Sequence, residues 1–224
     1  MRFSVKYLPT TLFSLKASGS TNSGAKTLFL PSPYSIKMAI LNQAITVGGE
    51  LAELEKRGSK AFSYVRDTQI SFRIEENSFF SVNNSFVKIL KPAREGGGFS
   101  QTVAFREYLY LSGPIEIIFD VAEEEQKQYL TKYLHKINYF GKRGCFFQFV
   151  EYSDNPSESN VNEFNPKNIA IGVLQEYDDF EKQSIFDNAN NFSNSKAKRK
   201  KGIQVLPLNS INTSKAFTVY KSLK

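Results

Sequence analysis

Residues 137–150, INYFGKRGCFFQFV, constrain the fold of this chain more than any other stretch. The second half, residues 145–150, is aromatic and apolar, which favours a buried strand. The turn before it, residues 141–144, holds two cations between two glycines, which allow left-handed backbone angles and close approach of another backbone. The turn is therefore either a phosphate cradle of charged side chains and backbone N–H groups or an ordinary surface turn with solvated cations.

The composition is that of a chain with a substantial packed core. Hydrophobic residues make up 41% of the 224 residues, with 20 Phe and 11 Tyr, which excludes global disorder. One cysteine and one histidine argue against both a disulfide framework and a zinc site. We expect neither a signal peptide nor a membrane-spanning segment, because the given N-terminal residues reach prolines and charges quickly and no apolar run approaches membrane-spanning length. We therefore expect a cytoplasmic protein without a metal or other cofactor.

The net charge of +7 is distributed unevenly along the chain. Residues 1–119 carry +5 and residues 188–224 carry +8, whereas residues 120–187 between them carry −6. A basic first half and a basic tail favour a polyanionic partner such as nucleic acid, although charge blocks are also ordinary solvated surface. The acidic middle part is suited to a basic protein neighbour.

The first half of the chain begins with a strand and a helix. Residues 2–8 alternate apolar and polar side chains, as a half-buried strand does. Within residues 28–47, Ser32 and Pro33 are typical of the start of a helix, and Gly48 follows its end. The helical spacing predicts an apolar face formed by Ile36, Ala39, Ile40, Ala44 and Val47. A second, charged helix is predicted over residues 50–56.

The middle of the chain has the pattern of a long hairpin. Strands are predicted over residues 69–74, 79–90 and 103–111, with Asn83-Asn84 as a turn. The basic loop between the last two strands, residues 91–99, contains three consecutive glycines, which lose much conformational entropy on ordering. It is either a tip that settles onto a ligand or a disordered surface loop.

The remaining elements complete the pattern. A strand over residues 115–121 is followed by a helix over residues 123–136, whose end carries His135. Cations favour helix C-termini, so we interpret His135 as a charge at a helix end and not as a catalytic group. Further strands are predicted over residues 169–174, 203–208 and 216–220. Residues 178–200 are polar and rich in Asn, and the stretch NANNFSNSKAKRKK, residues 188–201, is predicted to be flexible.

The order of the predicted elements is that of a β-α-β-β-α-β ferredoxin-like unit, the plan of RNA-recognition modules. We therefore expect an α+β fold with two helices on one face of an antiparallel sheet, a protruding β-hairpin and a short β-rich C-terminal extension. The usual aromatic signature of RNA-recognition motifs is absent, so the chain is not read as an ordinary member of that class.

Three stretches together resemble a known family. They are LPSPYSIKMAILNQAI at the first helix, FREYLYLSGPIEIIFDV after the glycine-rich loop, and INYFGKRGCFFQF. Their combination and order are similar to the CRISPR-associated protein 5 family, a branch of the RAMP superfamily and a subunit of type I Cascade complexes. The resemblance covers residues 1–152, the expected ferredoxin-like domain, and leaves residues 153–224 as a variable extension with a basic tail.

The resemblance implies a subunit that caps the 5′ handle of the CRISPR RNA, contacts the backbone and large subunits, and meets target DNA through the complex. The hairpin of residues 79–111 becomes a thumb that reaches RNA and the neighbouring backbone subunit. Gly141 and Gly144 allow the RNA backbone to approach, and bases stack on aromatic rings for about 1–3 kcal/mol each. The implied RNA contacts are Lys26, Tyr34, Lys37, Lys88, Lys91, Arg94, Phe99, Arg106, Tyr108, Lys142 and Arg143.

One branch of the family cuts precursor RNA without metal, using Tyr, Lys and His side chains. Such cleavage needs a base and an acid, and His135 is the one histidine here. We expect no nuclease activity, because this histidine is predicted at a helix end away from the RNA. Three hypotheses remain: an RNA-binding Cascade subunit, a RAMP-type endoribonuclease that uses Tyr34 or His135, and a basic protein-interaction module without an RNA role.

Overall fold

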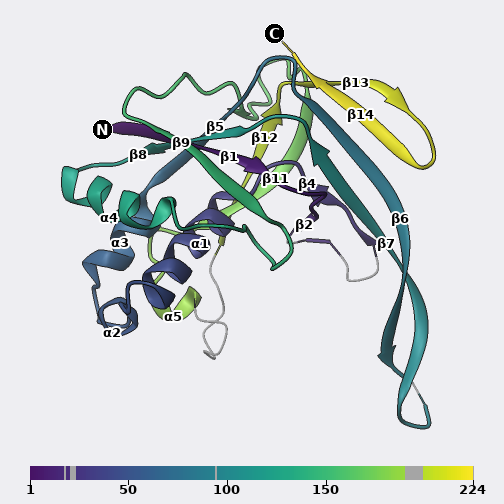
Figure 1. Ribbon diagram of the computed structural model, residues 1–224, viewed down its shortest axis with the longest axis horizontal. Helices are drawn as coiled ribbons and strands as arrows, with labels where there is room; N and C mark the ends of the chain where they lie inside the picture. The colour runs from purple at the N-terminus through teal and green to yellow at the C-terminus, as the bar shows by residue number, and fades with distance from the viewer. Residues whose placement is uncertain (18, 21–23, 94, 190–198, 224) are drawn as a thin grey trace.

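The computed structural model describes residues 1–17, 19–20, 24–93, 95–189 and 199–223 (Figure 1). Its body is a four-stranded sheet in the order β5-β8-β1-β9, in which every neighbouring pair is antiparallel. The strands are β1 (Arg2–Pro9), β5 (Gln69–Ile74), β8 (Ile115–Asp120) and β9 (Phe147–Ser153). All four strands were predicted, although β9 begins two residues after Cys145.

Helices pack on one face of this sheet (Figure 1). The two long ones, α1 (Pro33–Thr46) and α4 (Glu124–Leu134), follow β1 and β8 respectively. The predicted start of α1 is confirmed, because Ser32 Oγ accepts a hydrogen bond from the Ser35 backbone N–H and Pro33 is the first helical residue. Val47, predicted on the buried face, is exposed because it lies beyond the last turn of the helix. The shorter helices are α2 (Leu51–Leu54), α3 (Lys60–Asp67), which was not predicted, and α5 (Phe186–Ala189).

The core lies between the helices and the sheet. On β1, the side chains of Phe3, Val5 and Tyr7 face the helices and are buried, as the alternation predicts. Phe3 stacks on Phe119 of β8 with ring centroids 5.0 Å apart. The Tyr7 hydroxyl donates a hydrogen bond of 2.6 Å to the Leu134 carbonyl at the end of α4. This bond fixes the end of the helix over the central strand.

The thumb hairpin is inserted between β5 and β8. Its strands β6 (Phe79–Pro92) and β7 (Phe99–Leu111) pair continuously, and Figure 1 shows the hairpin reaching out from the body. The predicted hairpin is therefore confirmed, and the predicted turn at Asn83-Asn84 is wrong. Both asparagines are paired within the ladder, opposite Tyr108 and Glu107.

The C-terminal part forms a three-stranded sheet, in the order β10-β12-β11, and adds two strands to the sheet of the thumb. It contributes β10 (Asn162–Glu163), β11 (Val173–Phe180), β12 (Arg199–Leu206), β13 (Leu208–Thr213) and β14 (Phe217–Ser222). β14 pairs with β6 at the base of the thumb, and β11 lies against α1. The strand predicted over residues 169–174 is wrong in its position, because Ile169 and Ile171 are exposed and β11 instead runs on into the stretch that the sequence marks as polar.

Three short strands join the N-terminal loop to this framework. β2 (Leu15–Lys16) pairs with β4 (Thr27–Leu28), and β3 (Gly24–Ala25) pairs in parallel with β7. Phe13 and Leu109 exchange two backbone hydrogen bonds of 2.7 and 3.0 Å, which attach the same loop to the thumb. Among the described residues, no helix has the length and apolarity needed to cross a membrane.

Candidate nucleic-acid interface

The glycine turn has the backbone that its sequence predicts. Gly141 and Gly144 have φ values of 68° and 100°, in the left-handed region that favours glycine. A hydrogen bond of 3.2 Å from the Cys145 backbone N–H to the Lys142 carbonyl closes the turn. The side chains of Lys142 and Arg143 are both exposed at its tip. The turn therefore presents two cations and an accessible backbone to solvent.

An open pocket of about 270 Å³ lies beside this turn. Gly141 forms one wall, Tyr34 in the first turn of α1 forms another, and Lys16 of β2 lies at the border. The pairing of Lys16 with Thr27 holds β2 in this place. Two regions far apart in the sequence, the glycine turn and the start of the first helix, thus meet at one pocket.

The aromatic ring of Tyr34 is not free to receive a base. The guanidinium carbon of Arg199 lies 4.0 Å from the ring centroid, and the Phe180 ring packs against it with centroids 4.8 Å apart. Arg199 Nη1 also forms an ion pair of 3.2 Å with Asp178 Oδ2. The planar group offered to the pocket is therefore the Arg199 guanidinium, backed by Tyr34.

Sequence reasoning missed the pocket residues that come from the C-terminal strands. They are Glu176 and Asp178 of β11 and Arg199 of β12. The one sequence feature that could have indicated a role for Arg199 is the run of basic residues around it. That run lies in a segment that the sequence predicts to be flexible.

Lys37 was predicted to contact RNA, and the structure corrects this. The residue is 1% exposed, and its Nζ lies 2.7 Å from Asp179 Oδ1 and 2.8 Å from the Arg66 carbonyl. Burial lowers the pKa of the Lys37 ammonium, and the Asp179 carboxylate opposes that shift. Because β11 packs over this side of α1, Lys37 has a structural ion pair where an RNA contact was expected.

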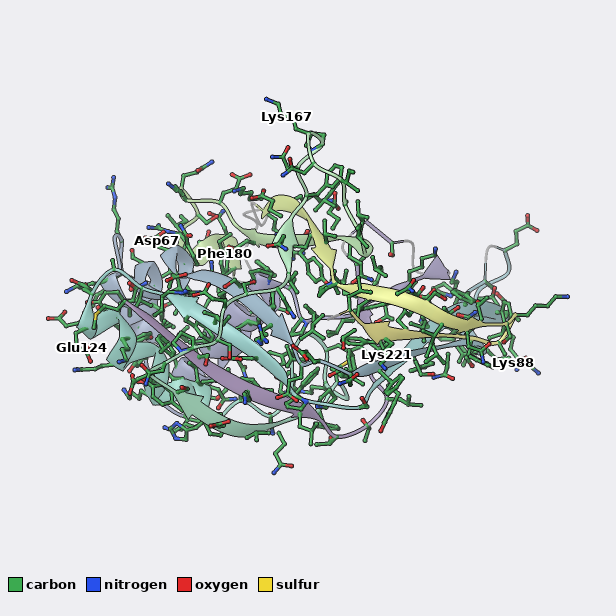
Figure 2. The ribbon with its side chains drawn as sticks, turned by 90° about the horizontal axis from the view of Figure 1, so that it is seen from above. Asp67, Lys88, Glu124, Lys167, Phe180 and Lys221 are labelled. Carbon is green, nitrogen blue, oxygen red and sulfur yellow. The ribbon has the colours of Figure 1, made fainter. Side chains whose placement is uncertain are left out.

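The thumb carries the other predicted contacts. Lys88 is exposed and Lys91 half-buried near the tip, and Figure 2 places Lys88 at the end of the molecule opposite Glu124. Lys26 is exposed next to Ala25, whose backbone pairs with half-buried Arg106 of β7. The remaining predicted contacts are exposed Phe99, half-buried Tyr108, and Arg94, which lies outside the described residues. None of the described side chains among these lines the pocket beside Gly141.

One face of the thumb is apolar well beyond the body. Phe86 is 75% exposed, and its ring packs edge-on against Phe105 with centroids 5.7 Å apart. By the period-two rule this face continues the one that buries Phe80 and Leu109 at the base of the hairpin. Other exposed apolar residues on the same face are Leu90, Phe99 and Val103. By the same rule Lys88 lies on this face between Phe86 and Leu90, so the face combines exposed apolar side chains with a cation. Exposed apolar side chains gathered in this way are typical of a protein contact.

The sheet face opposite the helices offers little to RNA. Buried Glu116 accepts hydrogen bonds from Ser4 Oγ at 2.7 Å and from the Ser157 backbone N–H at 3.1 Å. Burial alone would raise the pKa of Glu116, but these hydrogen bonds hold it below its usual value. The charges of this face are paired with one another, as in the ion pairs Arg2–Asp120 and Lys6–Glu151. Residues 157–161 also cover part of it, unlike the open sheet of an RNA-recognition module.

His135 occupies the predicted place at the end of α4. Its exposed ring lies with Nδ1 3.3 Å from the Thr131 carbonyl. It lines a separate hollow between α4 and β9, beside Phe149 and Tyr152, and not the pocket beside Gly141.

The chain is similar in sequence to a curated CRISPR-associated protein. No family model matches the chain. The chain is 24% identical over 194 residues to CRISPR-associated protein Cas5 from Archaeoglobus fulgidus, a match that spans 82% of this chain and 81% of that protein. The resemblance to the CRISPR-associated protein 5 family, inferred from three motifs, is confirmed by this curated relative.

Two solved structures are also similar to the chain. One is a CRISPR protein from Archaeoglobus fulgidus, with a TM-score of 0.44 and 13% identity over 100% of this chain and 92% of that one. The other is the Csm3–Csm4 subcomplex of the type III-A CRISPR–Cas interference complex, with a TM-score of 0.38 and 13% identity over 100% and 93%.

Proposed function

We propose that this chain is a non-catalytic RNA-binding subunit of a type I Cascade complex, which caps the 5′ handle of the CRISPR RNA. The observation that carries the proposal is the meeting of the glycine turn and the start of α1 at one pocket bordered by Lys16. Lys142 and Arg143 extend from the turn beside it, where they neutralise RNA phosphates. The curated relative named Cas5 supports a role in a CRISPR complex.

The strand order supports a ferredoxin-like body for residues 1–152. Four antiparallel strands in the order β5-β8-β1-β9, with helices after β1 and β8, match the β-α-β-β-α-β plan. The thumb is inserted between the second and third of these strands. Residues 153–224 form an extension that contributes Arg199 to the pocket, so the extension takes part in RNA binding.

The thumb has two roles in this proposal. Lys91, on one face of the hairpin, and Lys88, on the other, contact RNA phosphates. Phe86 and Leu90, which share the face of Lys88, pack on the neighbouring backbone subunit. The large subunit and, through the complex, target DNA are the further partners. The complex acts in antiviral defence in the cytoplasm.

The absence of nuclease activity is part of the proposal. His135 lies at the end of α4 beside a hollow that does not include the glycine turn or Tyr34. General acid–base cleavage requires a catalytic side chain within hydrogen-bond reach of the RNA, directly or through one water. His135 is therefore not positioned to act on RNA that is bound in the pocket beside Gly141. A separate enzyme then processes the precursor RNA.

The test is to purify the tagged chain together with its partner subunits and to sequence the RNA that it retains. The proposal predicts mature guides that begin with the 5′ handle. Cut precursors made by the chain alone would establish the endoribonuclease hypothesis instead. Recovery of partner proteins without RNA would establish a protein-interaction module.

A further inference from the structure

The pocket beside Gly141 contains carboxylates, which a site for phosphate alone would not need. Glu176 and Asp178 both line it, although each would repel a phosphate group. Carboxylates at an RNA site have a use as acceptors for the N–H groups of a base edge. This inference therefore rests on the proposed function, and it concerns which base the same pocket takes.

Arg199 supplies a fixed plane on which a base can stack. Its guanidinium is supported by the Tyr34 ring at 4.0 Å and held at its edge by Asp178 at 3.2 Å. The side chain is still 36% exposed. Unpaired RNA bases stack on arginine guanidinium planes as they do on aromatic rings. The two supports reduce the entropy that the side chain loses when a base arrives.

The Glu176 carboxylate can accept further hydrogen bonds. One carboxylate oxygen, Oε1, lies 2.6 Å from Lys201 Nζ, and the side chain is 47% exposed. A carboxylate has about four acceptor sites, so an ion pair with one lysine leaves room for two further donors. The hydroxyl groups of Ser32 and Ser35 are already used in the cap of α1.

We propose that this pocket takes one unpaired guanine of the RNA, stacked on Arg199, with its N1–H and N2–H₂ groups donating to Glu176. Guanine presents two adjacent donors on its Watson–Crick edge, which match the two oxygens of one carboxylate. Adenine, cytosine and uracil each place a hydrogen-bond acceptor beside the donor on the same edge. That acceptor would face a carboxylate oxygen of Glu176, and the two would repel each other. The volume of about 270 Å³ lies near the lower end of ligand sites, about 300–1,000 Å³, and suits one base.

The test uses the purified full chain and single-stranded heptauridine that carries one central guanosine. Binding is measured by fluorescence anisotropy against the same oligomer with adenosine, cytidine, uridine or inosine at that position. The pair of hydrogen bonds should make the guanosine oligomer bind about tenfold more tightly than the adenosine or uridine oligomers. Inosine, which lacks the N2 amino group, should fall between them.

Variants assign the preference to the pocket. Glu176→Gln should abolish the difference between guanosine and inosine, because the amide places a donor where a carboxylate oxygen stood. The matched control Glu124→Gln, at an exposed position in the first turn of α4, should keep the full preference. Arg199→Lys retains the positive charge but removes the planar guanidinium. It should therefore lower the affinity for all the oligomers without changing the salt dependence of binding.

The outcomes separate this inference from the proposed function. Salt-dependent binding with equal affinity for all five oligomers would overturn the guanine site and leave RNA binding intact. A guanosine preference that survives in Glu176→Gln would also overturn it. No binding to any oligomer, nor to handle RNA, would overturn the proposed function and the guanine site together.

Discussion

Replacing Lys37 by Met tests whether Lys37 stabilises the fold through its buried ion pair and does not contact RNA. The change keeps the length and apolar stem of the side chain but removes the ammonium that lies 2.7 Å from Asp179 and 2.8 Å from the Arg66 carbonyl. Removing one partner of a fully buried ion pair costs about 3–5 kcal/mol. The Asp179 side chain is 32% exposed and stays partly hydrated, so we expect the free energy of unfolding to fall by about 2 kcal/mol.

The assay is urea denaturation at pH 7, followed by thermal melting. A loss of about 2 kcal/mol corresponds to a fall in Tm of roughly 4–8 °C for a chain of this size. Handle-RNA affinity, measured well below the Tm, should be unchanged because Lys37 does not reach the surface. The double variant Lys37→Met/Asp179→Leu should recover most of the stability, since an apolar pair can replace a buried ion pair. Wild-type stability combined with weakened RNA binding in Lys37→Met would refute this reasoning.

Four further predictions concern single positions. Gly144→Val should lower both the thermal stability and the affinity for handle RNA, because a β-branched residue resists a φ of 100°. Thermal melting and fluorescence anisotropy measure the two effects, and wild-type values in both would show that the glycine is not required. His135→Ala should leave guide maturation unchanged, so accumulation of precursor in a folded variant would contradict its placement at a helix end. Phe86→Ser should reduce self-association of the isolated chain in size-exclusion chromatography, and an unchanged profile would argue that the thumb face is not adhesive. Burial alone would raise the pKa of Glu50, but hydrogen bonds from Lys132, Tyr133 and Tyr129 hold it below its usual value. The ionised Glu50 side chain should therefore stabilise the folded protein above about pH 4.5, and this contribution should be lost as the pH falls below that value. In a plot of stability against pH, Glu50→Gln should show a smaller loss of stability at acid pH.

Local features of the fold could be predicted because their causes are local. The start of α1 depends on Ser32 and Pro33, which are adjacent, and the left-handed turn depends on Gly141 and Gly144 themselves. The strands of the body and the thumb followed from alternation over a few residues. Asn83-Asn84 misled the prediction because their intrinsic preference for turns was overridden by pairing with β7 and β14.

The candidate site could be predicted only in part, because half of it is assembled by distant chain segments. Lys37 was expected to contact RNA because of the family resemblance, and the partner that buries it, Asp179, is 142 positions away. Arg199 lies in a run of cations that by composition resembles a flexible tail, yet β12 pairs it opposite Phe180 and beside Tyr34. No local pattern in the sequence indicates either contact.

The most direct test of the proposed RNA role is a salt titration of handle-RNA binding to the double variant Lys142→Ala/Arg143→Ala. The matched control is Lys56→Ala/Arg57→Ala, an exposed Lys-Arg pair just after α2 that removes the same charge. If both turn cations contact phosphates, the slope of log K against log salt should fall by about 1.4, or about 0.7 for each single-strand contact, while the control keeps the wild-type slope. Unchanged slope and affinity in the turn variant, with an unchanged Tm, would make the turn a plain surface feature and contradict the proposed RNA site.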